Sequence, residues 1–273
     1  MLHGHWCRPS DLLADGNRFI DVAAYLIIIP ARLDSSRLAR KVLLSAAGKP
    51  LVIHTWQAAL NSGADRVIIA ADDPAVVDAV SPYGAEVMMT GPADSGTDRL
   101  AQVAHQLNLD DDTVVVNLQA DEPLMPARVL DSLANELTQH SAAAIATACC
   151  PIEESTELFD PNAVKVVLDA DRNALYFSRA PVPFERGRFD LEPPQIPTKG
   201  HLRHLGVYAY RAGFLKAFSK LPPSDAEQAE SLEQLRALHY GYQIRVIRLQ
   251  QSTPQGIDTE KDWLAFSQYI NSL

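Results

Sequence analysis

Short apolar runs alternate with helical segments along the first half of the chain. The runs have the length of buried strands, and the segments between them carry helix-end signals such as proline in the first turn and glycine just past the end. The expected strands are 25–29, 66–70, 85–89 and 113–118, and the expected helices are 50–61, 74–80, 97–107 and 126–139. This alternation predicts an α/β fold, with a mostly parallel sheet and helices on both faces.

The second half of the chain is less regular. Strands are expected at 163–168, 205–210 and 244–249, and helices at 228–240 and 259–270. The segment 181–200 is polar and holds five prolines, so it is expected to be an irregular loop, of the kind that is usually functional or mobile. No internal repeat or linker is visible. We therefore expect an N-terminal extension over 1–21 and one domain over 22–273, which includes a small lobe.

Composition and charge narrow the class of protein. With 47% apolar residues the chain can form a core, and its net charge of −10 argues against a nucleic-acid partner. The cysteines Cys7, Cys149 and Cys150 form no CxxC pair, which predicts reduced thiols and a cytoplasmic location. The most apolar stretch, 22–30, is too short to span a membrane, so no membrane insertion is expected.

A basic loop follows the first expected strand. Arg32, Arg37, Arg40 and Lys41 lie within ten residues, beside Ser35 and Ser36. Ligands of such sheets bind beyond the carboxyl ends of the strands, and guanidinium and ammonium groups suit a polyphosphate. The loop is either an anion site of this kind or a solvated basic turn. It contains neither a GxxxxGK[ST] nor a GxGxxG pattern.

Two aspartates are candidate metal ligands. Asp121 directly follows the strand expected at 113–118, where a carboxylate facing a basic loop suits Mg²⁺; alternatively it is a turn residue before Pro123. Asp258 precedes Thr259 and Asp262, which match a capping box for the last helix. Asp258 is therefore either a second metal-binding carboxylate or part of a helix cap.

Other polar residues are weaker candidates. Segment 95–99 begins a helix, where free backbone N–H groups suit a ligand. Glu230, Glu233 and Gln234 have the spacing of one helix face and are able either to contact a polyhydroxylated ligand or to pair with solvent and Arg236. His204 either orients a substrate or is a core histidine.

Taken in order, these segments resemble the CMP-Kdo synthetases, the 3-deoxy-manno-octulosonate (Kdo) cytidylyltransferases. The resemblance covers 27–264 and is specific as an ordered set. It includes Pro30-Ala-Arg with Arg37 and Lys41, Ala71-Asp-Asp73, Ser95-Gly-Thr-Asp-Arg99, Asn117-Leu-Gln-Ala-Asp-Glu-Pro123, Asn162-Ala-Val-Lys-Val-Val167, Tyr176-Phe-Ser-Arg-Ala180, Arg203-His-Leu-Gly206, Leu232-Glu-Gln-Leu-Arg236 and Gly256-Ile-Asp-Thr259. It implies a mixed seven-stranded sheet of the nucleotide-diphospho-sugar transferase type, with a small β lobe that forms a homodimer.

The resemblance also implies a reaction and a set of site residues. CMP is transferred from CTP to Kdo, giving CMP-Kdo and pyrophosphate for lipopolysaccharide biosynthesis. By this resemblance the CTP triphosphate is held by Arg32, Ser35, Arg37 and Lys41, and the cytidine lies against Ser95, Gly96 and Thr97. The sugar acid is contacted by Gln119, Arg179, His204, Glu230 and Gln234. Mg²⁺ is held by Asp121 and Asp258. Asp121, Asp258, Arg37 and Lys41 are the expected catalytic residues, with a second Mg²⁺ on the β- and γ-phosphates.

The sequence departs from the family pattern in the basic loop. The family reads Arg-Leu-Pro-Gly-Lys-Pro-Leu where this chain reads Arg37-Leu-Ala-Arg-Lys-Val-Leu43, and Ala120 replaces a glycine. The lost glycine matters if the backbone there needs a positive φ or a close approach to phosphate. We expect weaker CTP binding or a shifted metal geometry. Two alternatives to the Kdo reaction are the same chemistry on 8-amino-Kdo or another acid sugar, and a weakened nucleotide-binding relic.

Overall fold

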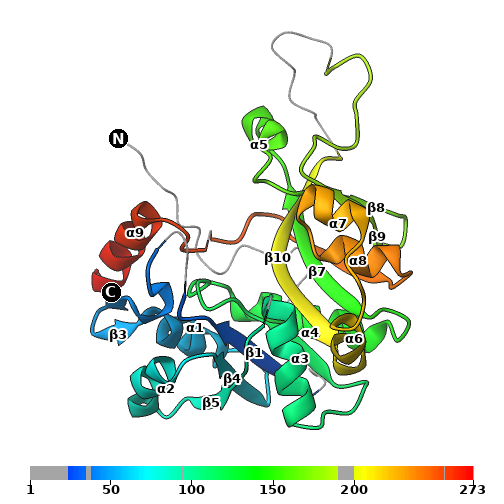
Figure 1. Cartoon of the computed structure of the whole chain (residues 1–273). Helices are drawn as coiled ribbons and strands as arrows, with labels where there is room; N and C mark the ends of the chain where they lie inside the picture. The colour runs from blue at the N-terminus through cyan, green and yellow to red at the C-terminus, as the bar shows by residue number, and fades with distance from the viewer. Residues whose placement is uncertain (1–23, 35–37, 94, 190–199, 255, 273) are drawn as a thin grey trace.

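The computed structural model describes residues 24–34, 38–93, 95–189, 200–254 and 256–272. Within these ranges the chain forms an α/β structure around one large sheet (Figure 1). The strands are β1 (Tyr25–Ala31), β2 (Ser45–Ala46), β3 (Lys49–Pro50), β4 (Arg66–Ala71), β5 (Glu86–Met89), β6 (Val114–Asn117), β7 (Ile145–Pro151), β8 (Lys165–Leu168), β9 (Ala174–Ser178), β10 (Leu202–Arg211) and β11 (Ile244–Arg248). The helices are α1 (Leu51–Ala59), α2 (Pro74–Val80), α3 (Gly96–Gln106), α4 (Ala127–Gln139), α5 (Ser155–Phe159), α6 (Ala212–Phe218), α7 (Asp225–Glu230), α8 (Gln234–His239) and α9 (Glu260–Asn271), with 3₁₀ turns η2 (Lys41–Leu43) and η3 (Ser81–Tyr83).

The sheet is mixed, as the resemblance implied. Its main path runs β11-β7-β10-β6-β1-β4-β5, and in the described residues β8 and β9 add a hairpin beside β10. Strands β1, β4, β5 and β6 are parallel neighbours, and β11 is parallel to β7, whereas β10 is antiparallel to both β6 and β7. The carboxyl ends of β1, β4 and β6 therefore meet at one edge, where the basic loop and Asp121 follow them.

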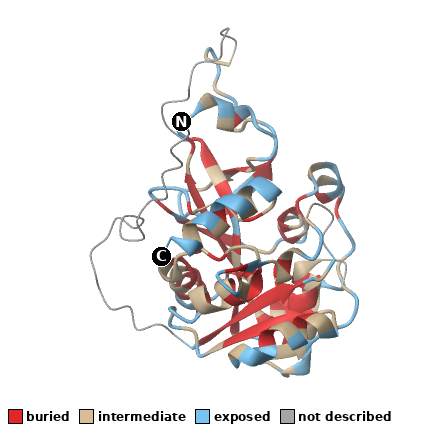
Figure 2. Ribbon diagram, turned by 90° about the vertical axis from the view of Figure 1, so that its left-hand side faces the viewer, coloured by how far each residue is buried: buried red, intermediate tan, exposed pale blue. Residues whose placement is uncertain are grey.

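Both faces of the sheet are buried, which explains the continuous apolar runs. On β1, Ile27 and Ile29 pack in one core and Ile28 packs in the other, because successive side chains point to opposite faces. Helices α1, α2 and α4 contribute to the first core, and α3, α6 and α8 contribute to the second. Figure 2 shows the sheet as buried, with exposed residues on the outer sides of the helices.

One central strand was not among the predicted elements. Strand β7 is built of small residues and lies between β11 and β10, with Cys149 and Cys150 both buried and in the free thiol state. Cys149 and Cys150 are therefore buried free thiols, while Cys7 lies outside the described residues. Small residues give little β signal, so the strand depends on its neighbours rather than on its own propensity.

The helix predicted over 228–240 is wrong. A capping box on Ser224 begins α7, and Ser231 then adopts a left-handed conformation, with φ 51° and ψ 51°, that ends this helix. Leu232 turns into the core and α8 begins after Glu233. Glu230 ends α7 and Gln234 begins α8, so these two residues do not lie on one helix face although their spacing in the sequence suggested it.

The last helix returns to the other end of the molecule. From β11 the chain crosses the structure and α9 lies beside β3 and α1 (Figure 1). A hydrogen bond from Ile257 N to Asp121 O, 2.9 Å long, and the packing of Ile257 and Phe266 with Leu51 hold this segment in place. The predicted capping box of Thr259 and Asp262 is confirmed, so Thr259 rather than Asp258 is the cap.

Some predictions fall on residues outside the described ranges. The extension at 1–21 is one, and 190–199 of the expected irregular loop is another; the described part, 181–189, has no helix or strand. Across the described residues, no helix combines the length and the apolar character needed to cross a membrane.

Candidate active site

Three charged side chains from distant parts of the chain meet at the carboxyl edge of the sheet. Lys41 Nζ forms an ion pair with Asp121 and lies 3.2 Å from Asp258 Oδ1. Lys41 belongs to the turn after β1, Asp121 to the turn after β6, and Asp258 to the segment before α9. Burial of the Lys41 ammonium opposes its charge, but the two carboxylates outweigh burial and raise its pKa. Lys41 is therefore a fixed positive charge between two carboxylates.

Glu122 is a functional candidate that the sequence reasoning did not single out. Burial, and then the charges of Asp121 and Asp258, raise the pKa of Glu122 to about 8. Gly256 packs against it so closely that a Cβ at this position would lie 2.9 Å from Glu122 Oε1. The only signal in the sequence was the adjacency of Glu122 to Asp121.

The basic loop is only partly described. Arg32 and Lys41 lie in described positions, whereas Ser35, Ser36 and Arg37 are outside them. Arg40 adopts the left-handed conformation, with φ 51° and ψ 35°, immediately before Lys41. The positive φ for which a glycine would be suited is therefore present, and this chain fills it with arginine.

The strain at Arg40 gives a testable prediction. A left-handed non-glycine residue costs roughly 1–2 kcal/mol, so Arg40→Gly should have a free energy of unfolding about 1 kcal/mol higher than Arg40→Ala. Both variants lack the guanidinium of this exposed residue, so their difference isolates the backbone conformation. Urea denaturation measures it, and equal midpoints for the two variants would contradict the prediction.

A buried ion pair joins helix α3 to Asp72 in the turn after β4, and Asp72 in turn holds Leu33 of the basic loop. Arg99 is 3% exposed, and its Nη2 lies 3.0 Å from Asp72 Oδ2. The other oxygen of Asp72 accepts a hydrogen bond from Leu33 N, also 3.0 Å long. The structure thus assigns a shared structural role to Asp72 and Arg99, which were seen in the sequence only as parts of separate motifs.

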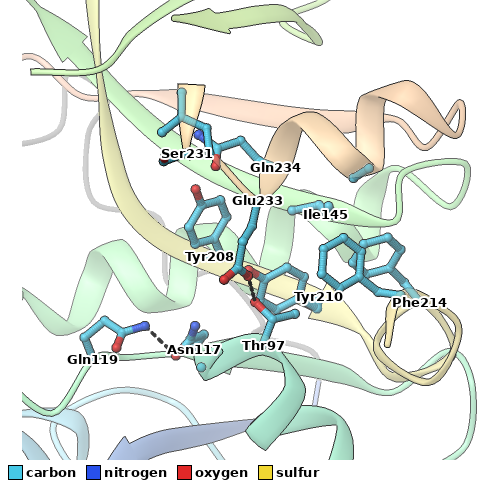
Figure 3. Close-up of a pocket in the computed structure, with 14 residues that line it drawn as sticks. Thr97, Asn117, Gln119, Ile145, Tyr208, Tyr210, Phe214, Ser231, Glu233 and Gln234 are labelled. Atoms are coloured by element: carbon cyan, nitrogen blue, oxygen red, sulfur yellow. Dashed lines mark hydrogen bonds between the residues drawn. The ribbon is translucent and has the colours of Figure 1, made fainter. Parts of the chain in front are cut away.

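The start of α3 faces the carboxyl edge of the sheet. Ser95 caps the helix, because its Oγ accepts a hydrogen bond from Asp98 N. Gly96 leaves space beside Gln119 and Pro30, since an added Cβ would lie 3.5 Å from Gln119 Nε2. Thr97 Oγ1 donates a 2.9 Å hydrogen bond to Glu233 Oε2 across a cavity (Figure 3).

Two cavities adjoin this edge, and Tyr208, Leu232 and Gln234 line both of them. The smaller cavity has a volume of about 220 Å³ and is also lined by Thr97, Asn117, Gln119, Tyr210 and Glu233 (Figure 3). The larger cavity has a volume of about 620 Å³ and is also lined by Glu122, Asn162, Arg203, His204 and Gly256. Polar groups from β6, β10 and the α7–α8 junction thus surround a space next to the charged cluster.

The residues predicted for the sugar acid divide into two groups. Gln119, His204 and Gln234 line the cavities. Arg179 and Glu230 instead bond to each other and to Ser178. The carboxylate of Glu230 accepts hydrogen bonds from Arg179 N at 2.8 Å and from Ser178 Oγ at 2.7 Å, and Arg179 Nε donates to Glu230 O at 2.6 Å. Their predicted contact with the sugar stays a prediction.

Comparisons with known proteins identify the family. A cytidylyltransferase family model matches residues 26–246. A 3-deoxy-manno-octulosonate cytidylyltransferase of Chromohalobacter salexigens is 50% identical over 238 residues, covering 87% of this chain and 93% of the relative. This chain belongs to the 3-deoxy-manno-octulosonate cytidylyltransferase family.

A further relative and a solved structure give the same family assignment. The one from Halorhodospira halophila is 47% identical over 251 residues, covering 91% of this chain and 98% of the relative. A solved structure of CMP:2-keto-3-deoxy-manno-octonic acid synthetase, complexed with CTP, superposes with a TM-score of 0.82 at 39% identity, covering 91% of this chain and 98% of the other. The predicted fold of the cytidylyltransferase family is therefore confirmed.

Proposed function

We propose that this protein transfers CMP from CTP to Kdo, giving CMP-Kdo and pyrophosphate for lipopolysaccharide biosynthesis. The observation that carries the proposal is the convergence of Lys41, Asp121 and Asp258 at the carboxyl edge of the sheet, beside the two polar cavities. Relatives that share about half of their residues with this chain are named for this reaction. The substrates are CTP and Kdo, and no nucleic-acid partner is proposed.

In the proposed reaction the anomeric C2 hydroxyl of Kdo attacks the α-phosphorus of CTP in line, and pyrophosphate leaves. Positioning and charge neutralisation account for most of the acceleration in such a displacement. Lys41 keeps its proton because its pKa is raised, so it stays available to neutralise phosphate charge together with Arg32 and Arg37. The cavities beside the cluster would hold the sugar acid with its hydroxyl toward the nucleotide.

We further propose that Asp121 and Asp258 hold Mg²⁺. Both carboxylates converge on the ammonium of Lys41, and this convergence supports a site at which Asp121 and Asp258 bind the same ion. Mg²⁺ prefers one or two carboxylates together with phosphate oxygens and water, and this donor set fits. When bound, the ion would lower the pKa of the attacking hydroxyl and offset phosphate charge.

The assembly and location are also proposals. Phe159 and Phe184 are 40% and 64% exposed, and their rings lie 5.4 and 5.1 Å from that of Phe189, on the lobe that carries α5. An exposed aromatic cluster of this kind supports docking of a second copy, and hence a homodimer. Buried reduced thiols at Cys149 and Cys150 support a cytoplasmic location.

Pyrophosphate release tests the function. The protein is incubated with CTP and Mg²⁺ alone, and then with Kdo, 8-amino-Kdo or sialic acid. Release that depends on Kdo is the expected result. Faster release with 8-amino-Kdo would mean that the amino sugar, and not Kdo, is the preferred substrate. CTP binding without pyrophosphate release for any sugar would mean that the protein is a nucleotide-binding relic, and the proposal would be wrong.

A further inference from the structure

Strand β10 has a bulge beside the larger cavity. His204 pairs with Cys149 and Leu205 with Ala148, but the next pair is Tyr208 with Thr147. Two residues, Gly206 and Val207, are therefore extra on β10, and such bulges re-aim the side chains around them. The bulge lies where His204 and Tyr208 both line the cavity, with their ring centroids 5.4 Å apart.

Thr147 fills the bulge from the opposite strand. It is fully buried, and its Oγ1 lies 3.2 Å from Leu205 O, 2.9 Å from Val207 O and 2.9 Å from His204 Nε2. A threonine hydroxyl has one proton to donate, and the two carbonyl oxygens only accept. When the hydroxyl donates that proton to one of the carbonyl oxygens, its contact with His204 is a hydrogen bond only if Nε2 carries a proton. His204 Nε2–H then donates to Thr147 Oγ1.

The ring of His204 is held and kept neutral. Phe177 packs edge-on against it, with centroids 4.9 Å apart, and burial lowers the pKa of His204 to about 3. A neutral imidazole with its proton on Nε2 has a lone pair on Nδ1. The described residues provide hydrogen bonds to Nε2 alone, so Nδ1 is left for a ligand of the cavity.

We propose that Thr147 is a positioning residue: its hydroxyl holds His204 as the Nε2–H tautomer, so that Nδ1 accepts a hydrogen bond from a hydroxyl group of the sugar acid. The contact with the sugar rests on the proposed function, whereas the tautomer does not. An acceptor at this position selects a hydroxyl donor and repels a carboxylate. The carboxylate of the sugar acid must therefore bind elsewhere in the cavities.

The tautomer is tested first, in the full-length protein without substrate. Nitrogen-15 NMR of the histidine side chains distinguishes a protonated from an unprotonated ring nitrogen, and the His204 signals are assigned by their absence in His204→Gln. Protonated Nε2 and unprotonated Nδ1 at pH 7 are expected. A proton on Nδ1 would overturn the proposal, whether or not the protein turns over Kdo.

Steady-state kinetics of Thr147→Val and Thr147→Ser test the consequence. Valine keeps the shape and loses the hydroxyl, so KM for Kdo should rise about tenfold, the scale of one hydrogen bond, while KM for CTP stays within about twofold. Serine restores the hydroxyl, the tautomer and the KM for Kdo. An unchanged KM for Kdo in a folded Thr147→Val variant, or a KM for Kdo in Thr147→Ser that stays as high as that of the valine variant, would overturn it.

Discussion

Asp121→Asn is expected to lower kcat by about a thousandfold or more without unfolding the protein. The amide keeps the shape of the carboxylate and removes the charge that would hold Mg²⁺, and several kcal/mol of charge stabilisation correspond to about three powers of ten in rate. Asp258→Asn should show the same loss, because Asp258 is the second carboxylate proposed to hold Mg²⁺, and it faces Asp121 across Lys41. Turnover is measured as pyrophosphate release over a range of Mg²⁺ concentrations.

A matched control separates this effect from general loss of charge. Asp110 is an exposed aspartate in the loop before β6, and Asp110→Asn removes one carboxylate away from the cluster. Its kcat should equal that of the unchanged protein. If Asp121→Asn or Asp258→Asn turned over at a rate near normal, the assignment of these residues to Mg²⁺ would be wrong.

Arg99→Met is expected to lower the free energy of unfolding by about 2–3 kcal/mol. Removing one partner of a buried ion pair costs roughly 3–5 kcal/mol, and the partial exposure of Asp72 reduces that figure. The change also removes the guanidinium that positions the Asp72 carboxylate, to which Leu33 N donates, so the basic loop should be held less firmly and KM for CTP should rise. Urea denaturation and CTP titration give the two readouts.

The double variant Arg99→Met with Asp72→Asn is the control for Arg99→Met. It removes the carboxylate that Arg99→Met leaves without its guanidinium, so it should recover part of the lost stability. A free energy of unfolding within about 0.5 kcal/mol of the unchanged protein for Arg99→Met alone would contradict a role for this pair.

The elements with strong local signals were predictable. Strand β1 is a continuous apolar run, and its continuity reflects burial on both faces. The capping box of Thr259 and Asp262 also marked the start of α9. Where local signals were weak or misleading the prediction failed: β7 has small residues, and the helical spacing around Glu230 hides the left-handed turn at Ser231.

The site shows the same division. The sequence determined the family through the order of its short motifs, and it marked Lys41, Asp121 and Asp258 as chemically suitable residues. It did not determine that they meet, because Lys41 is 80 residues from Asp121 and 217 from Asp258. Parallel strands and the return of the chain to α9 decided that contact.

Only the tertiary structure set the environment of each group. The raised pKa of Glu122 depends on burial and on two carboxylates, one of them 136 residues away. The tautomer proposed for His204 depends on Thr147, which reaches it across a bulge between two strands. Residue types and local periodicity can be read from the sequence. The burial of an ionisable group and the charges around it arise only when distant segments pack together.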